Sequence, residues 1–460
     1  MRETARWKSC RTVPWVVCLL AILPCPALGQ PAGVTALVGG TLIDGHGGPP
    51  LQNSLIVIEG ERIRAVGTVG TVAVPEGAQV ISTEGMTVLP GLWDMHVHLM
   101  ITGHSDYAHW DRTYPALFES VIMPASARQL LMAGVTSARD LGGPLEASIA
   151  VRDAIADGSI PGPTLYVSGP FIQHEPYPGT ETFRWGVTGE ADAREKVRRL
   201  AEAGVDLIKL IDQDQMTIEE VRAVVDEAHR QGKPVIAHAH RPEEIQRGLE
   251  AGVDDFEHTG LATAPAYPER LLTMLKERAA QGNRPPLFWT PTISVLYNYD
   301  HVRDDFRETL DDPCWQDGLP DQVVADIRQS LANWGELPYY RMVPSRRPTL
   351  RQKFAQLRSS GAVLLVGTDS GVPGVFHCQS TWNELDVWVN VFGVPAMDAI
   401  RAATYWPAVA MDAIDEAGTV SPGKYADIIA VRGDVLRHIA LLQNVDLVVK
   451  RGVVVKGGTE

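Results

Sequence analysis

Histidine pairs follow two short apolar runs of the sequence. His96-Val97-His98 ends one run, and His238-Ala239-His240 ends another. A spacing of two residues along a strand puts both imidazoles on one face, where they can bind a single metal ion. One such pair is equally compatible with two ordinary polar residues near a loop, so the pair alone defines no site.

Single polar residues occupy corresponding positions in three further runs. His258 and Asp369 each close an apolar run, and Lys209 lies inside one. A buried ammonium group is costly. It can form a salt bridge, extend to the surface, or react with CO₂ to form a carbamate that bridges two cations. Each residue also has a structural explanation, such as a helix N-cap for Asp369.

Together these side chains form a set of nitrogen and oxygen donors. The candidate ligands are His96, His98, Lys209, His238, His258 and Asp369. The only cysteines after residue 29 are Cys314 and Cys378, which excludes a zinc site made of thiolates. Whether these two cysteines form a disulfide stays open. Donors of this kind suit Zn²⁺, with Mn²⁺ or Co²⁺ as substitutes.

The elements expected to carry these residues are strands that alternate with helices. The eight predicted strands are 92–97, 135–138, 165–167, 207–210, 234–237, 254–256, 287–289 and 363–366. The predicted helices between them are 193–203, 218–231, 242–251 and 268–281. This alternation predicts an α/β fold with a (β/α)₈ TIM barrel, in which reactive side chains lie at the C-terminal strand ends.

The two ends of the chain consist of short Val- and Ile-rich runs between glycine-containing turns. Neither residues 30–90 nor residues 406–460 supply enough strands for a stable sheet. We therefore expect one small β-sandwich domain built from both chain ends, next to a barrel at 91–405. Residues 293–350, rich in Trp, Tyr, Pro and Asp, predict a lid-like insertion over the barrel mouth.

Residues 1–29 have the pattern of a secretory signal peptide. A basic stretch precedes the apolar run 13–23, and the small residues Ala27 and Gly29 precede a cleavage site before Gln30. The apolar run is too short to span a bilayer. We therefore expect a secreted or periplasmic protein with no membrane attachment after cleavage.

The charge balance excludes one class of partner. The chain has 41 Lys and Arg against 56 Asp and Glu, a net charge of −15, and it has no basic run. A nucleic-acid-binding protein needs a basic surface. The expected partner is a small-molecule substrate, and a homo-oligomer stays possible.

The motifs of the chain resemble those of the metal-dependent amidohydrolase superfamily, closest to its imidazolonepropionase-like and Xaa-Pro dipeptidase-like branch. The resemblance extends from about Thr41 to Gly457. The motifs are LPGLWDMHVH at 89–98, AGVTSARD at 133–140, GVDLIK at 204–209, HAH at 238–240, AGVDDFEH at 251–258, GTDSG at 367–371, AAT at 402–404 and GTVSPGKYAD at 418–427.

The resemblance implies a binuclear metal centre with two divalent ions, zinc being the first expectation. The implied ligands are His96, His98 and Asp369 for one ion and His238 and His258 for the other, with carboxylated Lys209 bridging. A metal-bridging hydroxide would attack the substrate. Asp369 would take the proton of this hydroxide and deliver it to the leaving amine.

The resemblance also implies the reaction, a metal-dependent cleavage of an amide C–N bond in a small molecule by a secreted hydrolase. A dipeptide such as Xaa-Pro, or an N-acyl amino acid, is the expected substrate class. The alternatives are a lactonase or organophosphate hydrolase, a mononuclear deaminase and an inactive binding homologue. Deaminases usually place Glu where this chain has Arg241, and inactive relatives usually lose ligands.

Three further residues are candidates for substrate binding. His240 could contact substrate or replace His238 as a ligand, and Arg139 could receive a substrate carboxylate or pair with a nearby acid. His377 could line the barrel mouth. The branch often has a Gly-Gly-His-Gly-like loop after the third strand, where this chain has SGPFIQHEPYP at 168–178. A role for His174 therefore stays open.

Overall fold

The computed structural model describes residues 33–458 except 260–262, 283, 299–305, 334 and 336. The predicted signal peptide lies outside the described residues. Among the helices that are described, none combines the length and the apolar character needed to cross a membrane.

The centre of the molecule is an α/β arrangement of two parallel sheets. One sheet has the order β7 (Leu92–Val97), β8 (Val135–Asp140) and β9 (Thr164–Val167). The other has the order β11 (Arg184–Gly186), β10 (Phe171–Gln173), β12 (Ile208–Leu210), β13 (Val235–His238), β14 (Asp255–Glu257), β15 (Phe288–Thr290) and β16 (Val363–Leu364). Each of the eight predicted barrel strands is present, and β10 and β11 are additional.

Backbone hydrogen bonds connect the two parallel sheets at two places. Asp206 N donates to Val167 O at 2.9 Å on the side of β9 and β12. Met95 N donates to Val366 O at 3.0 Å, and an isolated bridge joins Val97 to Ser370, on the side of β7 and β16. These contacts bring the end of β7 beside the segment that follows β16.

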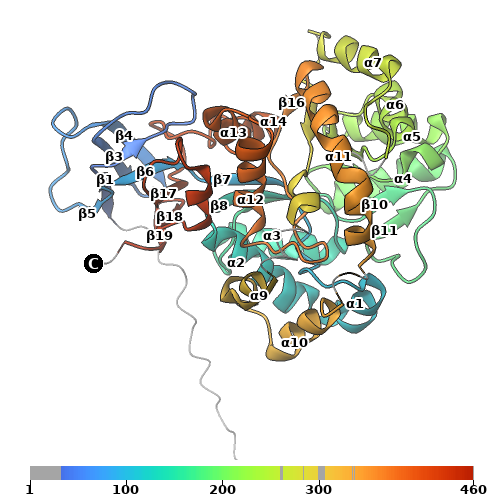
Figure 1. Cartoon of the computed structure of the whole chain (residues 1–460), viewed down its shortest axis with the longest axis horizontal. Coiled ribbons are helices and arrows are strands. Elements are labelled where there is room, and N and C mark those ends of the chain that lie inside the picture. Colours follow the sequence, from blue (N-terminus) through green and yellow to red (C-terminus); the bar gives the residue numbers. More distant parts are fainter. Residues whose placement is uncertain are drawn as a thin grey trace, which may run out of the picture.

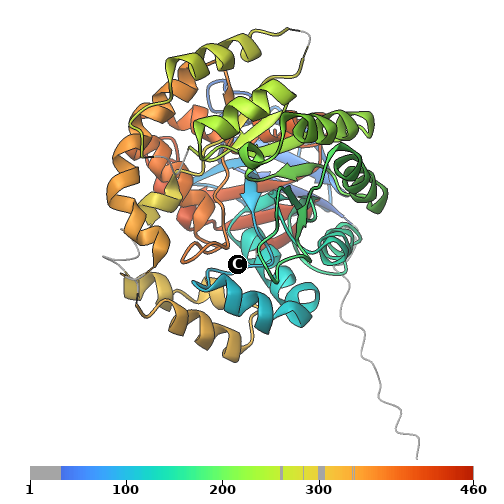
Figure 2. The same ribbon diagram turned by 90° about the vertical axis from the view of Figure 1, so that its right-hand side faces the viewer.

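Helices surround these strands, and Figure 2 shows α4–α7 side by side around one part of them. The helices along the chain are α1 (Tyr107–Thr113), α2 (Met123–Met132), α3 (Leu145–Ala156), α4 (Glu190–Ala203), α5 (Ile218–Arg230), α6 (Pro242–Ala251), α7 (Glu269–Ala279), α9 (Phe306–Asp311), α10 (Asp321–Ser330), α11 (Pro338–Ser359), α12 (Ser380–Asp386), α13 (Ala396–Ala402) and α14 (Tyr405–Ala410). The four predicted helices correspond to α4–α7.

Local sequence explains where these helices begin and end. The Thr217 hydroxyl oxygen accepts a hydrogen bond from Glu220 N, and the Glu220 carboxylate accepts one from Thr217 N, a capping box that starts α5. α4 ends at Gly204 with φ of 94°, a left-handed conformation that glycine adopts without steric cost. The apolar faces of these helices pack onto the strands through buried residues such as Val224 and Phe256.

Strands from both chain ends share one sheet. Its order is β19 (Val453–Lys456), β18 (Leu447–Lys450), β17 (Ile428–Arg432), β6 (Met86–Pro90) and β2 (Thr41–Leu42). The second sheet has the order β4 (Arg62–Thr68), β3 (Ser54–Glu59), β1 (Val34–Val38) and β5 (Gln79–Ser82). Figure 1 shows both sheets at one end of the molecule, far from α4–α7. The domain boundaries at 90 and 405 stay predictions.

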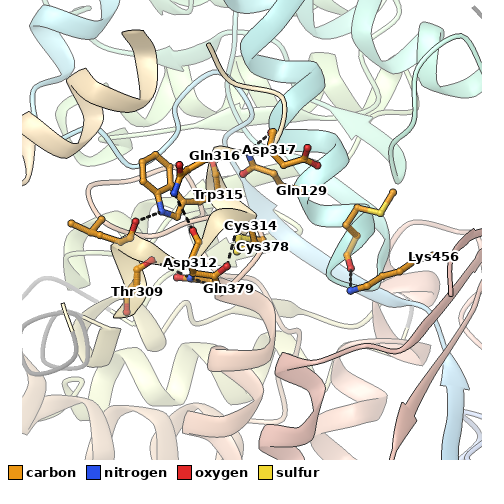
Figure 3. Close-up of a disulfide and its surroundings, with 12 residues drawn as sticks. Gln129, Thr309, Asp312, Cys314, Trp315, Gln316, Asp317, Cys378, Gln379 and Lys456 are labelled. Carbon is orange, nitrogen blue, oxygen red and sulfur yellow. Dashed lines mark hydrogen bonds between the residues drawn. A yellow bond between two sulfur atoms is a disulfide. The ribbon is translucent and has the colours of Figure 1, made fainter. Parts of the chain in front are cut away.

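The insertion 293–350 contains α9, α10 and the first part of α11, which the sequence analysis did not predict. Cys314 and Cys378 form a disulfide with a Cα–Cα distance of 6.0 Å (Figure 3). The Nε2 amide of Gln129 in α2 donates to the carbonyls of Trp315 and Asp317 at 2.8 and 2.9 Å. This part of the insertion is therefore fixed to α2 and, covalently, to the segment after β16.

Candidate metal centre and active-site cavity

Three candidate ligands converge where β7 ends. His96 and His98 lie two residues apart and point to the same side, toward Asp369. His96 Nε2 is 3.3 Å from His98 Nε2, and Asp369 Oδ1 is 3.3 Å from His96 Nε2 and 3.2 Å from His98 Nε2. We call these three residues the first triad. Two imidazoles and a carboxylate at these distances can surround one cation.

Buried acids fix the orientation of the first triad. His96 Nδ1 bonds Glu257 Oε2 at 2.6 Å, which leaves the lone pair of Nε2 facing the other two ligands. Asp94 accepts hydrogen bonds from Thr368 Oγ1 at 2.7 Å and Thr381 Oγ1 at 2.8 Å. Because Thr368 precedes Asp369, these bonds also hold the loop that carries the third ligand.

Asp369 is in a backbone conformation that non-glycine residues rarely adopt. Its φ is 55°, and the other predicted ligand with positive φ is His258, at 76°. The next helix with a described start, α12, begins at Ser380, so Asp369 is not the helix N-cap that the structural alternative required. Such backbone outliers occur preferentially at functional sites.

Three imidazoles form a second group beside the first triad. The ring centroids of His238 and His240 are 4.8 Å apart, those of His238 and His258 are 4.7 Å apart, and those of His240 and His258 are 4.3 Å apart. We call these residues the second triad. His258 Nδ1 bonds Thr292 Oγ1 at 2.8 Å, whereas Nδ1 of His238 and of His240 has no hydrogen-bond partner among the described residues.

The two triads are adjacent. The rings of His96 and His258 lie 4.8 Å apart, and ligand atoms of His96, His258 and Asp369 lie within 4.8 Å of one another. Burial lowers the pKa of His98 from 6.5, holds the pKa of His238 and His258 well below it, and lowers that of His240 to about 3. These imidazoles are neutral at neutral pH, so their lone pairs are available to a cation.

The remaining two charged groups of the site respond differently to burial. Burial alone would raise the pKa of Asp369, but His96, His98 and His258 outweigh it and hold the pKa well below 3.8. Lys209 is 0% exposed, its Nζ has no described hydrogen-bond partner, and burial lowers its pKa to about 8. With this pKa the amine is still mostly protonated at neutral pH, so its buried charge lacks a hydrogen-bond partner among the described residues that would offset burial.

The donor set therefore suits divalent cations. It offers several imidazoles and a carboxylate without thiolates, and ligand atoms of His238, His240 and His258 lie within 4.8 Å of one another. Glu257, which orients the His96 imidazole, was not predicted from the sequence. Two acids at i and i+2 of a buried strand, Asp255 and Glu257, are the pattern that could have revealed it.

Two of the three predicted substrate-binding residues lie elsewhere. The Arg139 guanidinium is 2% exposed and pairs with Asp255 Oδ2 and Glu257 Oε1, both at 2.6 Å, so it supports Glu257 beneath the first triad. His377 is buried and its Nε2 contacts His98 O at 3.2 Å. Neither residue lines the cavity described next, and the ion pairs of Arg139 agree with the alternative predicted for it, pairing with a nearby acid.

A cavity of about 580 Å³ opens over the triads. His98, Asp369 and all three residues of the second triad line it, which agrees with either role predicted for His240. Val295, Leu296 and Leu350 form part of another wall, so the insertion borders the cavity as expected of a lid. His174 is exposed and does not line the cavity.

The chain belongs to the amidohydrolase family, whose model matches residues 87–455. Members of this family typically depend on metal ions, in agreement with the donor groups of the two triads.

Two relatives narrow the class of reaction. Ochratoxinase from Aspergillus niger is 26% identical over 456 residues, covering 90% of this chain and 84% of that protein, and its crystal structure gives a TM-score of 0.69 at 25% identity, covering 92% and 96%. An Xaa-Pro dipeptidase with methionine bound in its active site gives a TM-score of 0.71 at 26% identity, covering 92% of this chain and 100% of that one. The protein is therefore a hydrolase that acts on carbon–nitrogen bonds.

Proposed function

We propose that the protein is a secreted binuclear metal-dependent hydrolase that cleaves an amide bond in a dipeptide such as Xaa-Pro or in an N-acyl amino acid. The observation that carries this proposal is the adjacency of the two triads, with Lys209 buried and unpartnered. The similarity to an Xaa-Pro dipeptidase supports the dipeptide class.

The ligands divide between two ions. His96, His98 and Asp369 would hold one ion, and His238 and His258 would hold the other, with zinc as the first candidate. Bound ions would polarise the scissile carbonyl and lower the pKa of water enough for attack at neutral pH. Glu257 keeps the His96 imidazole in the tautomer that can coordinate.

Lys209 would complete the site as a carbamate. Its pKa of about 8 leaves about one tenth of the amine neutral at pH 7, and this form can add to CO₂ with release of a proton. The resulting anion replaces an ammonium that has no hydrogen-bond partner at a position that is 0% exposed. A carbamate at Lys209 would supply anionic oxygens to the metal site, which would explain why a lysine occupies this buried strand.

Asp369 would transfer the proton. Water adds to the carbonyl carbon and the C–N bond breaks, so one proton must pass from the water to the leaving nitrogen. Asp369 lines the cavity, and its carboxylate is ionised because its pKa is well below 3.8. As a carboxylate it can accept that proton, and its low pKa favours releasing the proton again to the amine.

The proposal includes a closed (β/α)₈ barrel and export from the cytoplasm. The hydrogen bonds between β9 and the start of β12, and between β7 and the end of β16, support closure. The Cys314–Cys378 disulfide supports an oxidising compartment, in agreement with the leader pattern of residues 1–29.

Two measurements on the Zn²⁺-loaded protein test this function. Elemental analysis should return two ions per chain, and a panel of dipeptides, N-acyl amino acids and lactones should show turnover of the amides. Full activity with a single ion would contradict the binuclear centre. Turnover of the lactones alone would contradict the amide substrate.

A further inference from the structure

Among the basic residues that line the cavity, one partly buried guanidinium has no ion-pair partner within the described part of the chain. Beyond the triads its lining is largely apolar and aromatic, and its basic residues are Arg112, Arg184 and Arg241. Arg241 is paired with Asp212, Asp214 and Glu244 at 2.7–2.9 Å. Arg112 is exposed at the end of α1.

Arg184 has a different environment. It lies at the start of β11, and its guanidinium carbon lies 5.1 Å from the ring centre of Phe171, 4.6 Å from that of Tyr177 and 5.4 Å from that of Phe183. Its Nη1 donates to Gln173 Oε1 at 3.2 Å, and its buried Nε has no described partner. Within the described part of the chain Arg184 forms no ion pair; Asp111 and Asp212 act on it only at longer range.

This arrangement is costly for the free protein. Removing a guanidinium from water without an anionic partner is unfavourable, and burial accordingly lowers the pKa of Arg184 from 12.5. Aromatic rings compensate in part through cation–π contact and hold the planar group in place. A guanidinium held in this way presents a donor fork that matches a carboxylate.

We propose that Arg184 binds the carboxylate of the substrate, so that the cavity selects amides whose amine half is an α-amino acid. This inference rests on the proposed function and deepens it. The triads hold the scissile amide at one end of the cavity, while Arg184 anchors the acidic group and the surrounding rings contact the side chain. Arg184 thus takes the carboxylate-binding role that was one of two predicted for Arg139. The guanidinium of Arg139 instead forms ion pairs with Asp255 and Glu257.

The test compares two substrates that differ only in the carboxylate, N-acetyl-L-phenylalanine and N-acetyl-2-phenylethylamine. Arg184→Gln should lower kcat/KM for the acid by about 10- to 100-fold, the value of a lost charge-assisted hydrogen bond, and change kcat/KM for the neutral amide less than twofold. Arg184→Lys should lie between wild type and Arg184→Gln. The control is Arg199→Gln, because Arg199 is exposed, stacks on the neighbouring Trp185 at 4.6 Å and does not line the cavity.

A binding measurement keeps this inference separable from the proposed function. In the Asp369→Asn background, calorimetry should show the dissociation constant of N-acetyl-L-phenylalanine rising by the same factor when Arg184→Gln is added. If wild type hydrolyses neither compound, the proposed function is wrong for this class, and the dissociation constants still decide the role of Arg184. Equal losses for the acid and the neutral amide, or no loss for either, would overturn the inference.

Discussion

The two triads differ in how firmly the protein holds them. In the first triad the ligand atoms lie 3.2–3.3 Å apart and the outer nitrogen of His96 is fixed by Glu257, itself paired with Arg139. In the second triad only His258 has such a partner, Thr292, and His238 and His240 each keep an unpartnered Nδ1.

The first triad is therefore preorganised for a cation, whereas the second triad can adapt to one. Partners that fix the outer nitrogen of a ligand set its tautomer and its direction before a cation arrives. In the second triad no described partner fixes Nδ1 of His238 or His240, so the cation would set their tautomers. Either residue could be the ligand beside His258. The first triad should therefore be more sensitive to conservative substitution than the second triad.

The largest effect is expected for Asp369→Asn in the first triad. The amide keeps the size of the side chain and one oxygen, so the fold, much of the metal and substrate binding should survive. Loss of the proton-transferring carboxylate should lower kcat by about 10²–10⁴. Steady-state kinetics with a thermal unfolding control measure this, and a near-wild-type kcat would refute the assigned role.

The next effect is expected for Lys209→Ala, which removes the group between the triads. Metal content should fall below two ions per chain and activity by about 100-fold, the scale seen when a group that supports a metal site is lost. Formate, acetate or bicarbonate should restore part of the activity by occupying the gap. A variant that keeps both ions and normal turnover would make Lys209 a structural lysine.

Paired substitutions in the second triad sharpen the comparison further. His238→Ala should lose one ion and about 10- to 100-fold in activity, because His238 lies at the end of β13 and is the predicted ligand. His240→Ala should keep both ions and mainly raise KM. Elemental analysis of the two variants decides between them, and the reverse pattern would assign the ligand role to His240.

The smallest effect is expected for Asp140, a buried acid at the end of β8. Burial raises the pKa of Asp140 from 3.8 to about 7, so between these values the folded chain holds a proton that the unfolded chain releases. This residue therefore makes folding less stable as pH rises from about 4 to 7, by up to ~1.4 kcal/mol per pH unit. Urea unfolding at pH 5, 6 and 7 should show Asp140→Asn gaining stability relative to wild type; a constant difference would contradict this.

Periodicity and glycine placement predicted much of the fold. The eight runs assigned to strands match β7–β9 and β12–β16 because each is apolar and bounded by turn residues. The helices of the insertion were missed because residues such as Pro344 and Pro348 argue against a helix, yet both lie inside α11. Val343 and Leu350, which flank these prolines, are buried in the hydrophobic core, and this packing outweighs the local preference.

Site residues could be predicted where residue type and sequence spacing are informative. They were missed where only their contacts in the folded structure identify them. His96 and His98 follow from strand periodicity together with the motif that contains them. The sequence left Arg139 with two possible partners, a substrate carboxylate or a nearby acid, because it does not show which side of a barrel a side chain reaches; the structure shows ion pairs with Asp255 and Glu257. Arg184 carries no motif at all, and its importance arises from its three aromatic neighbours.

The sheet that joins both chain ends sets an order of events during synthesis. β6 ends at Pro90, while its partner β17 begins at Ile428. At ~5–20 residues per second, β6 waits roughly tens of seconds before that partner leaves the ribosome. Throughout this time an apolar strand edge stays open to association with other chains, so an unfinished or C-terminally cut chain should depend on chaperones in a way that the complete one does not.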